Sequence, residues 1–230
     1  MDPARTGRPL NVLIVVAMEL EARVVRKACP NAPLLVTGVG ARSAERAITQ
    51  ALADSPPDAV LHVGWAGGLR AGLARGDLVL VTAADGLAVP DDLLDPVRNA
   101  LARLPCRLSQ GPLATASRVV AEPVDKLALG RATGALAVDM ESGPVARACS
   151  EAGVPWIGLR AISDPADQRL PPIGLRATFR FLARPGAPLD LLRTIDGARR
   201  ANASLALAIP AALSALATAS GAGDRGRAPA

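Results

Sequence analysis

Short runs of apolar residues alternate along the chain with longer segments in which apolar residues recur every three or four positions. The short runs predict strands at residues 10–16, 34–37, 59–63, 78–82, 113–116, 135–138 and 156–162. The longer segments predict helices at residues 19–28, 41–53, 91–103, 123–131, 141–152 and 189–218, the last with a kink at Pro210. Strands that alternate with helices are typical of βαβ units, so we predict an α/β fold around a largely parallel sheet.

The length and composition predict a single packed domain. The chain has 230 residues, of which 50% are hydrophobic and 20% are charged, and this suits one α/β domain with a substantial core. We expect the domain to span residues 10–220, with flexible tails at residues 1–9 and 221–230.

Two apolar segments have features of membrane signals. Residues 10–18 resemble the core of a signal peptide, but Glu19 and Glu21 follow directly, which favours a buried strand. Residues 201–223 carry no charge and are long enough to span a bilayer, but they are mostly Ala and contain a proline. A core helix is the favoured interpretation, and contact with a membrane surface is the alternative.

The net charge of +5 does not by itself predict binding to nucleic acid. The arginines are scattered, lysine occurs only at Lys27 and Lys126, and the basic residues form no cluster. Aromatic residues make up 2% of the chain, which argues against the stacking platforms that bind single-stranded nucleic acid. Any surface that stacks on a base must therefore use aliphatic side chains or one of these few rings.

The cysteines and the single histidine predict neither disulfides nor a metal site. Cys29, Cys106 and Cys149 are odd in number and far apart, which fits reduced thiols in a cytoplasmic protein. His62 lies within an apolar run, and a lone histidine supplies neither a zinc cluster nor a Ser-His-Asp triad. We expect a buried histidine in a strand.

Acidic residues gather after the predicted strands. Glu21 follows the first strand, residues 139–142 (Asp-Met-Glu-Ser) follow the sixth, and Asp164 follows the seventh. Ligands of open α/β sheets bind beyond the carboxyl ends of the strands, where these side chains would meet. Each carboxylate alone is commonly a helix cap, but together they predict an acid/base cluster.

Two glycine-rich segments also follow strands. Residues 64–68 (Gly-Trp-Ala-Gly-Gly) predict a loop whose backbone can approach a ligand closely. Residues 38–40 (Gly-Val-Gly) resemble a dinucleotide fingerprint only weakly, since the next strand does not end on an acidic residue. A dinucleotide cofactor is therefore not predicted.

Four motifs occur in an order and spacing that resemble bacterial methylthioadenosine/S-adenosylhomocysteine nucleosidases. They are Ala-Met-Glu-x-Glu at 17–21, Gly-x-Ala-Gly-Gly-Leu at 64–69, Val-Asp-Met-Glu-Ser at 138–142 and Arg-Ala-Ile-Ser-Asp at 160–164. The resemblance covers about residues 10–170 and identifies the chain as a member of the nucleoside phosphorylase and nucleosidase superfamily. It implies a three-layer α/β fold with a mixed, largely parallel sheet, cleavage of a purine nucleoside, no cofactor, and a homodimer or larger homo-oligomer.

The resemblance also implies two catalytic residues. Asp164 would protonate N7 of the purine as the base leaves, and Glu21 would activate the attacking water. Breaking an N-glycosidic bond builds positive charge on the ribose and negative charge on the base, so an acid near the base and carboxylates near the sugar match the reaction. Asp164 must then carry a proton at neutral pH, which requires a raised pKa in a partly dry site.

Five further residues would bind or position the substrate, by the same resemblance. Glu141 would hold the ribose hydroxyls, and Met140 would pack under the sugar. Ser163 would orient the catalytic acid, and Ala66 and Gly67 would line the pocket.

The substrate is predicted from departures from those nucleosidases. Trp65 replaces a small or polar residue and either packs against the core or shapes the pocket, and residues 117–120 lack the Phe-Ile segment that sandwiches adenine. Residues 166–173, together with 137–142 and 184–186, instead resemble the hopanoid-associated phosphorylase branch, which implies release of adenine from adenosylhopane and peripheral contact with the inner face of the membrane. The alternatives are a methylthioadenosine/S-adenosylhomocysteine or futalosine nucleosidase, another purine nucleosidase, and a catalytically silent nucleoside-binding protein.

Water and inorganic phosphate are both candidate nucleophiles. Phosphorolysis needs a fixed anion site, and Arg42 and Arg70 lie near the glycine-rich segments. Glu21 favours hydrolysis, because a carboxylate can act as a base on water. We therefore predict water as the nucleophile, with phosphate as the alternative co-substrate.

Overall fold

The computed structural model describes residues 10–171 and 187–222. The strands are β1 (Val12–Val16), β2 (Leu34–Val36), β3 (Ala59–Gly68), β4 (Leu78–Ala84), β5 (Leu87–Ala88), β6 (Leu108–Thr115), β7 (Ala137–Asp139) and β8 (Trp156–Asp164). The helices are α1 (Glu19–Ala28), α2 (Ala41–Asp54), α3 (Asp91–Leu101), α4 (Pro123–Thr133), α5 (Ser142–Glu151) and α7 (Ala187–Ala222). The predicted tails lie outside the described residues, except for residues 221 and 222, which belong to α7. Residues 172–173 and 184–186, which carry part of the resemblance to the hopanoid-associated branch, also lie outside them.

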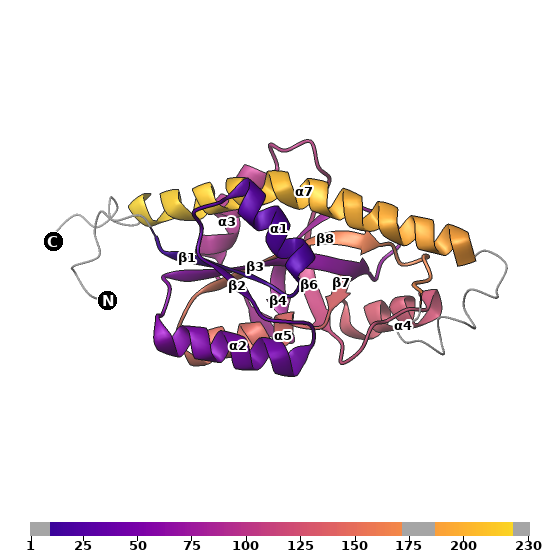
Figure 1. Cartoon of the computed structure of the whole chain (residues 1–230), viewed down its shortest axis with the longest axis horizontal. Coiled ribbons are helices and arrows are strands. Elements are labelled where there is room, and N and C mark those ends of the chain that lie inside the picture. Colours follow the sequence, from indigo (N-terminus) through magenta and orange to yellow (C-terminus); the bar gives the residue numbers. More distant parts are fainter. Residues whose placement is uncertain (1–9, 172–186, 223–230) are drawn as a thin grey trace.

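A mixed sheet forms the centre of the molecule (Figure 1). Its strands lie in the order β2-β1-β3-β7-β6-β4-β5, and β8 closes a circuit because it pairs with both β3 and β4. Among the described residues, five strand pairs are parallel and three are antiparallel, the latter being β3–β7, β4–β5 and β4–β8. The prediction of a mixed, largely parallel sheet is confirmed.

Helices on both faces of the sheet make the three layers. Helices α1 and α3 both contact α7 on one face, and α2 packs against α5 on the other (Figure 1). The core between the layers is aliphatic, with fully buried Ile14, Leu61 and Leu159 from the strands. Val145 from α5 and Ile209 from α7 pack onto it, so these two helices bury apolar side chains against the sheet.

Besides boundary shifts of one or two residues, three features of the sheet differ from the sequence prediction. The predicted loop at residues 64–68 is the second half of β3, which pairs with β8 as far as Gly67 and with β7 at Gly67 and Gly68. Strand β6 begins at Leu108 rather than at residue 113, and the short strand β5 is absent from the prediction. Pairing with strands distant in sequence keeps the extended parts of β3 and β6 in the sheet, and local patterns do not reveal such pairing. Strand β5, in contrast, forms a hairpin with β4 across Asp85 and Gly86, a local turn signal that the prediction missed.

The long helix α7 closes the core on one face of the sheet. Its buried side chains include Ala201, Leu205 and Leu216, so the prediction of a core helix is confirmed, and the helix continues through Pro210. Within the described part of the chain, its segment Leu189–Thr218 is the one helix long and apolar enough to cross a membrane.

Close contact between α7 and β8 depends on Gly197. A Cβ atom at this position would lie 1.9 Å from the carbonyl oxygen of Ser163, near the end of β8. Glycine inside a helix costs about 1 kcal/mol relative to alanine, so this position gives up helix stability for a close approach to the strand.

We predict that Gly197→Ala lowers the free energy of unfolding by about 1–3 kcal/mol, because α7 must move away from β8. Urea denaturation followed by circular dichroism measures this change. Ala203→Gly, at an exposed position of the same helix, measures the effect of helix propensity alone. A gain of about 1 kcal/mol in Gly197→Ala, the usual effect in helices, would contradict this account of the packing.

Candidate active site

A pocket of about 300 Å³ opens where the carboxyl ends of β1, β3, β7 and β8 come together. It is lined by all seven residues that the resemblance assigns to the site, namely Glu21, Ala66, Gly67, Met140, Glu141, Ser163 and Asp164. The fold thus gathers residues from distant parts of the chain at one edge of the sheet, and their individual roles remain predictions.

Glu21 lies in the first turn of α1 and is held by three backbone amides. Its Oε2 accepts hydrogen bonds from the amides of Ala17 (3.1 Å) and Met18 (2.9 Å), and its Oε1 accepts one from the amide of Trp65 (2.8 Å). Burial raises the pKa of Glu21, while these amides and the nearby positive charge of Arg160 lower it. Glu21 therefore caps its helix and also lines the pocket.

Asp164 is the last residue of β8 and is almost fully buried. Its Oδ1 accepts a hydrogen bond from the Ser163 hydroxyl at 2.5 Å, and its Oδ2 accepts one from Lys126 Nζ at 2.5 Å. Burial raises the pKa of Asp164, and the ammonium of Lys126 acts against this rise. The contact with Ser163 fits the predicted orienting role, whereas the buried lysine is a site residue that the sequence motifs do not contain.

Glu141 precedes α5 and is also held by the backbone. Its Oε1 accepts a hydrogen bond from the amide of Gly40 at 2.6 Å, and its Oε2 accepts one from the amide of Met140 at 3.2 Å. Burial raises the pKa of Glu141, the bond from Gly40 lowers it, and the negative charge of Asp139 raises it. The glycine-rich segment at residues 38–40 thus binds a carboxylate of the pocket.

Two glycines of β3 leave room for the carboxylates. A Cβ atom at Gly64 would lie 2.8 Å from Glu21 Oε1, and one at Gly67 would lie 3.0 Å from Asp164 Oδ2. The sequence predicts that this backbone approaches a ligand closely. At these two positions it instead approaches the acidic side chains of Glu21 and Asp164.

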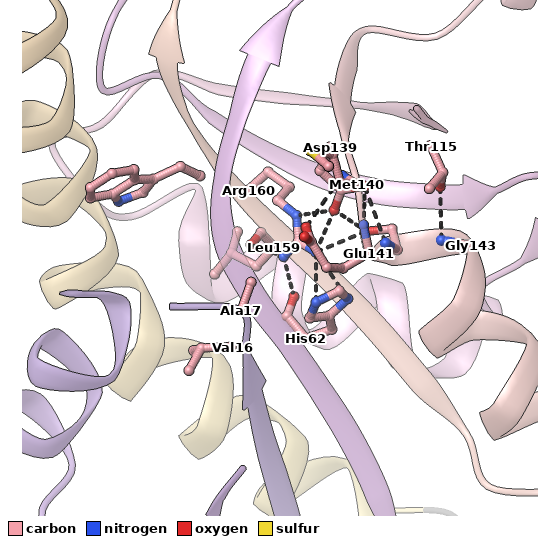
Figure 2. A network of polar contacts seen from close by, with 12 residues as sticks. Val16, Ala17, His62, Thr115, Asp139, Met140, Glu141, Gly143, Leu159 and Arg160 are labelled. Carbon is pink, nitrogen blue, oxygen red and sulfur yellow. Dashed lines mark hydrogen bonds and ion pairs between the residues drawn. The ribbon is translucent and has the colours of Figure 1, made fainter. Parts of the chain in front are cut away.

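A fully buried arginine connects the strands that carry the pocket residues (Figure 2). Arg160 donates to Asp139 Oδ2 from Nε (3.0 Å) and from Nη2 (2.8 Å), and its Nη1 donates to the carbonyl oxygen of His62 (2.9 Å). Its Nη2 also donates to the hydroxyl of Ser142 at 2.8 Å. Arg160 thus joins β8 to β3 and to the turn after β7, a role that the sequence motif alone does not reveal.

Asp139 extends this contact to Glu141. Its Oδ1 accepts hydrogen bonds from the amides of Glu141 (3.4 Å) and Ser142 (3.1 Å), so it shapes the turn from which Glu141 enters the pocket. Both ring nitrogens of His62 lie within 3.0 Å of Arg160 Nη2. Burial and the charge of Arg160 lower the pKa of His62 well below its ordinary value, so the histidine is neutral at pH 7. The prediction of a buried strand histidine is confirmed.

Aliphatic side chains and one indole form much of the remaining pocket wall. Val119, Val120 and Leu170 line it, and so does Trp65. The indole Nε1 of Trp65 donates to Asn202 Oδ1 in α7 at 2.9 Å, and the ring packs against the main core. Trp65 therefore combines the two roles that the sequence leaves open.

The arginines predicted as alternative phosphate ligands do not line the pocket. Arg42 and Arg70 are exposed, and Arg70 donates to the carbonyl oxygen of Gly134. Of the arginines in the described ranges, Arg118 lines the pocket, and it is exposed. No group of three or more His, Cys, Asp or Glu side chains that could hold a metal ion occurs in the part of the chain that the structure describes.

We predict that Arg160→Met lowers the free energy of unfolding by about 3–5 kcal/mol, because the buried carboxylate of Asp139 loses its charged partner. Urea denaturation measures this loss. The control is Arg98→Met, which removes an exposed ion pair with Asp95 and should cost about 1 kcal/mol or less. Similar small losses in both variants would show that the buried network does not hold these strands in place.

Comparisons with known proteins show the family of this chain. Residues 30–172 match the model of the phosphorylase superfamily. A 5'-methylthioadenosine/S-adenosylhomocysteine nucleosidase from Exiguobacterium sp. is 30% identical over an alignment of 159 residues, and the match covers 59% of this chain and 68% of that protein.

Solved structures share the fold. The methylthioadenosine/S-adenosylhomocysteine nucleosidase of Neisseria meningitidis, in complex with methylthio-immucillin-A, has a TM-score of 0.71 at 21% identity and covers 88% of this chain and 97% of its own. The corresponding enzyme of Colwellia psychrerythraea 34H, in complex with adenine, has a TM-score of 0.74 at 18% identity, with coverage of 91% and 96%. Futalosine hydrolase of Helicobacter pylori strain 26695 has a TM-score of 0.67 at 19% identity, with coverage of 86% and 97%. Because the family model matches more than half of its residues, this chain belongs to the phosphorylase superfamily.

Proposed function

We propose that this protein is a nucleosidase that hydrolyses the bond between adenine and ribose in a purine nucleoside. The observation that carries the proposal is that buried carboxylates line one pocket whose remaining wall is largely apolar, namely Glu21, Glu141, Asp164 and the Arg160-bound Asp139. Such a cluster suits a reaction that separates positive charge on the sugar from negative charge on the base. The names of the relatives support the same class of reaction.

In this proposal Asp164 is the general acid. Its carboxyl group protonates N7 of the purine as the bond between C1′ and N9 breaks, so the base leaves as a neutral molecule. Burial raises the pKa of Asp164, which favours a proton on this group, and the Ser163 hydroxyl keeps the carboxyl group oriented.

Glu21 is the proposed general base, which takes a proton from the water that attacks C1′. The three backbone amides fix both of its oxygens, so the base is in position before the substrate binds. Because burial raises the pKa of Glu21, it is a stronger base than an exposed glutamate.

The ribose is the proposed ligand of Glu141 and Met140. A carboxylate that is largely shielded from water and pre-positioned by Gly40 can accept hydrogen bonds from the ribose hydroxyls without much rearrangement. Met140, the neighbouring residue in the pocket wall, offers a flexible apolar surface for the sugar.

Water is the proposed nucleophile, and no cofactor is proposed. Glu21 supplies the base that hydrolysis needs, whereas Arg42 and Arg70 do not line the pocket. Phosphate remains the alternative co-substrate, and Arg118 is the pocket arginine that would have to bind it.

The favoured substrate is a thioether nucleoside, either methylthioadenosine or S-adenosylhomocysteine. The relative with 30% identity is named for both compounds, and solved structures with this fold contain methylthio-immucillin-A and adenine. A pocket of about 300 Å³ with aliphatic walls suits a flat base together with a small apolar group on the ribose, which is the case for methylthioadenosine. Futalosine is the alternative suggested by the fold of futalosine hydrolase.

Adenosylhopane is the second candidate substrate, and the exposed apolar residues of the pocket favour it. Val39 is 56% exposed and Val119 is 37% exposed, and both line the pocket. Apolar side chains near the start of α7 are exposed as well, namely Leu189, Leu191, Leu192 and Ile195. Such surfaces would suit a lipid-linked nucleoside and a cytoplasmic enzyme in peripheral contact with the inner face of the membrane.

A homo-oligomer is also proposed, and light scattering would measure its size.

We predict that Asp164→Asn and Glu21→Gln each lower kcat for adenine release by about 10²- to 10⁴-fold, because each removes a proton-transfer group. Chromatography of released adenine measures the rate. Glu19→Gln changes an exposed acid on the same helix as Glu21 and should leave the rate unchanged. If Asp164→Asn retains the wild-type rate, Asp164 is not the acid.

We also predict that the purified protein releases adenine from methylthioadenosine and that added phosphate does not change the rate. The same assay with adenosylhopane in detergent tests the second candidate. Release from adenosylhopane alone would assign the lipid-linked substrate, and a requirement for phosphate would identify a phosphorylase. Binding of these nucleosides without release of adenine would show a silent nucleoside-binding protein.

A further inference from the structure

Lys126 is a fully buried lysine whose ammonium group has three acceptors. It lies in α4, and its Nζ donates to Asp164 Oδ2 at 2.5 Å, to the carbonyl oxygen of Gln168 at 2.8 Å and to that of Pro165 at 3.1 Å. A lysine ammonium has three N–H donors, so this set of acceptors satisfies all of them. The site is therefore built for a charged lysine, and its one negatively charged partner among these acceptors is Asp164.

Other charged groups lie around the pair, and Glu122, which precedes α4, forms an ion pair with Arg169 next to Gln168. Arg75, from the segment between β3 and β4, bonds to the Oε1 of buried Gln168 and adds a second positive charge that acts on Asp164. Ser163 contributes a neutral hydroxyl to the other oxygen of the carboxylate. Both positive charges favour the ionised form of Asp164 before the substrate binds.

An ionised Asp164 poses a problem for the proposed reaction, because a general acid must have a proton to give. The nearest proton on a basic group is on Lys126 Nζ, 2.5 Å from the carboxylate. Burial raises the pKa of Asp164 and so makes transfer of this proton to the carboxylate easier. Helix α4 is held close to its neighbours, since a Cβ atom at Gly130 would lie 2.6 Å from the carbonyl oxygen of Leu69.

We propose that Lys126 stores the proton that Asp164 passes to the departing purine, an inference that rests on the proposed nucleosidase activity. An N–H bond of Lys126 breaks as an O–H bond forms on Asp164, and that O–H bond breaks as the N7–H bond forms. The electron pair of the C1′–N9 bond goes to the base. Lys126 is left as a neutral amine and Asp164 as a carboxylate. The attacking water gives its proton to Glu21, and exchange with solvent after product release restores both groups. Lys126 is thus a positioning residue for the proton and acts through Asp164.

Lys126→Met tests this assignment through the pH dependence of kcat/KM. In the wild type, the basic limb of the profile reports loss of the proton that the Lys126–Asp164 pair shares, so this limb lies at a higher pH than that of a carboxyl group alone. In Lys126→Met only the carboxyl proton of Asp164 remains, so the limb moves to lower pH. At pH 8, kcat/KM then falls by on the order of 10²-fold or more and recovers as the pH is lowered.

Two other profiles for Lys126→Met would overturn the proposal. A limb that moves to higher pH would show that the lysine only suppresses protonation of Asp164. A uniform loss at every pH, with no shift of the limb, would show a structural role. Lys27→Met changes the other lysine of the chain, which is exposed on α1, and the pH profile of this variant should equal that of the wild type.

Lys126→Arg separates the positive charge from the transferable proton. A guanidinium keeps the charge next to Asp164 but does not release a proton at any pH used in the assay. The proposal requires that kcat/KM at pH 8 stays low in this variant. Recovery of the wild-type rate would show that the charge alone is sufficient.

Nuclear magnetic resonance tests the pair without turnover and in the unmodified protein. With only two lysines, ¹⁵N-lysine labelling yields two Nζ signals, and Lys27→Met assigns them. Labelling of aspartate carboxyl carbons, with Asp164→Asn for assignment, reports the state of Asp164. The proposal requires an ammonium and an ionised carboxylate at pH 7, and a protonated Asp164 at that pH would overturn it. This outcome is independent of adenine release, so failure of the proposed function and failure of this inference are distinguishable.

Discussion

The buried ion pair between Arg160 and Asp139 is the interaction on which the geometry of the site depends. Removing both charges from water costs several kcal/mol per ion, and this cost is offset only where both groups are well hydrogen-bonded. Here the carboxylate of Asp139 and the carbonyl oxygen of His62 share one guanidinium, which comes from the neighbouring strand β8. Such a pair adds little net stability, but it sets the relative positions of β3, β7 and β8. Glu141 and Asp164 enter the pocket from the ends of two of these strands.

Small residues then create the space that the carboxylates occupy. Gly64 and Gly67 give Glu21 and Asp164 room beside β3, and Gly197 lets α7 close over the end of β8. These contacts exclude water from the acids, and the loss of water is the main cause of their raised pKa values. The backbone amides that bind Glu21 limit this effect, so the fold sets the proton affinity of each acid through the balance of burial and hydrogen bonds.

The strand-end motifs allow the fold class and the acid cluster to be predicted, because the motifs are local and parallel strands bring their carboxyl ends to one edge. The extension of β3 through residues 64–68 depends on pairing with β7 and β8, which no local pattern reveals. Arg160 could have been noticed as a charged residue inside an apolar strand. Lys126 lies in a helix without a recognisable motif, 38 residues before Asp164. The rarity of lysine in this arginine-rich chain is the one feature of the sequence that could have pointed to it.

The placement of charge around the pocket follows the proposed direction of electron flow. Glu21 and Glu141 are carboxylates without a lysine partner in the described residues, and negative charge on them would stabilise a sugar that becomes positive. Asp164, in contrast, has Lys126 against it, so the acid and its neighbour carry little net charge and can donate a proton to a base that becomes negative. An Asp164 without the lysine could protonate the base as well, but its carboxyl proton would be lost at a lower pH than the proton that the Lys126–Asp164 pair shares. The lysine therefore extends the pH range of the acid, while the two unpaired carboxylates maintain the opposite field at the sugar.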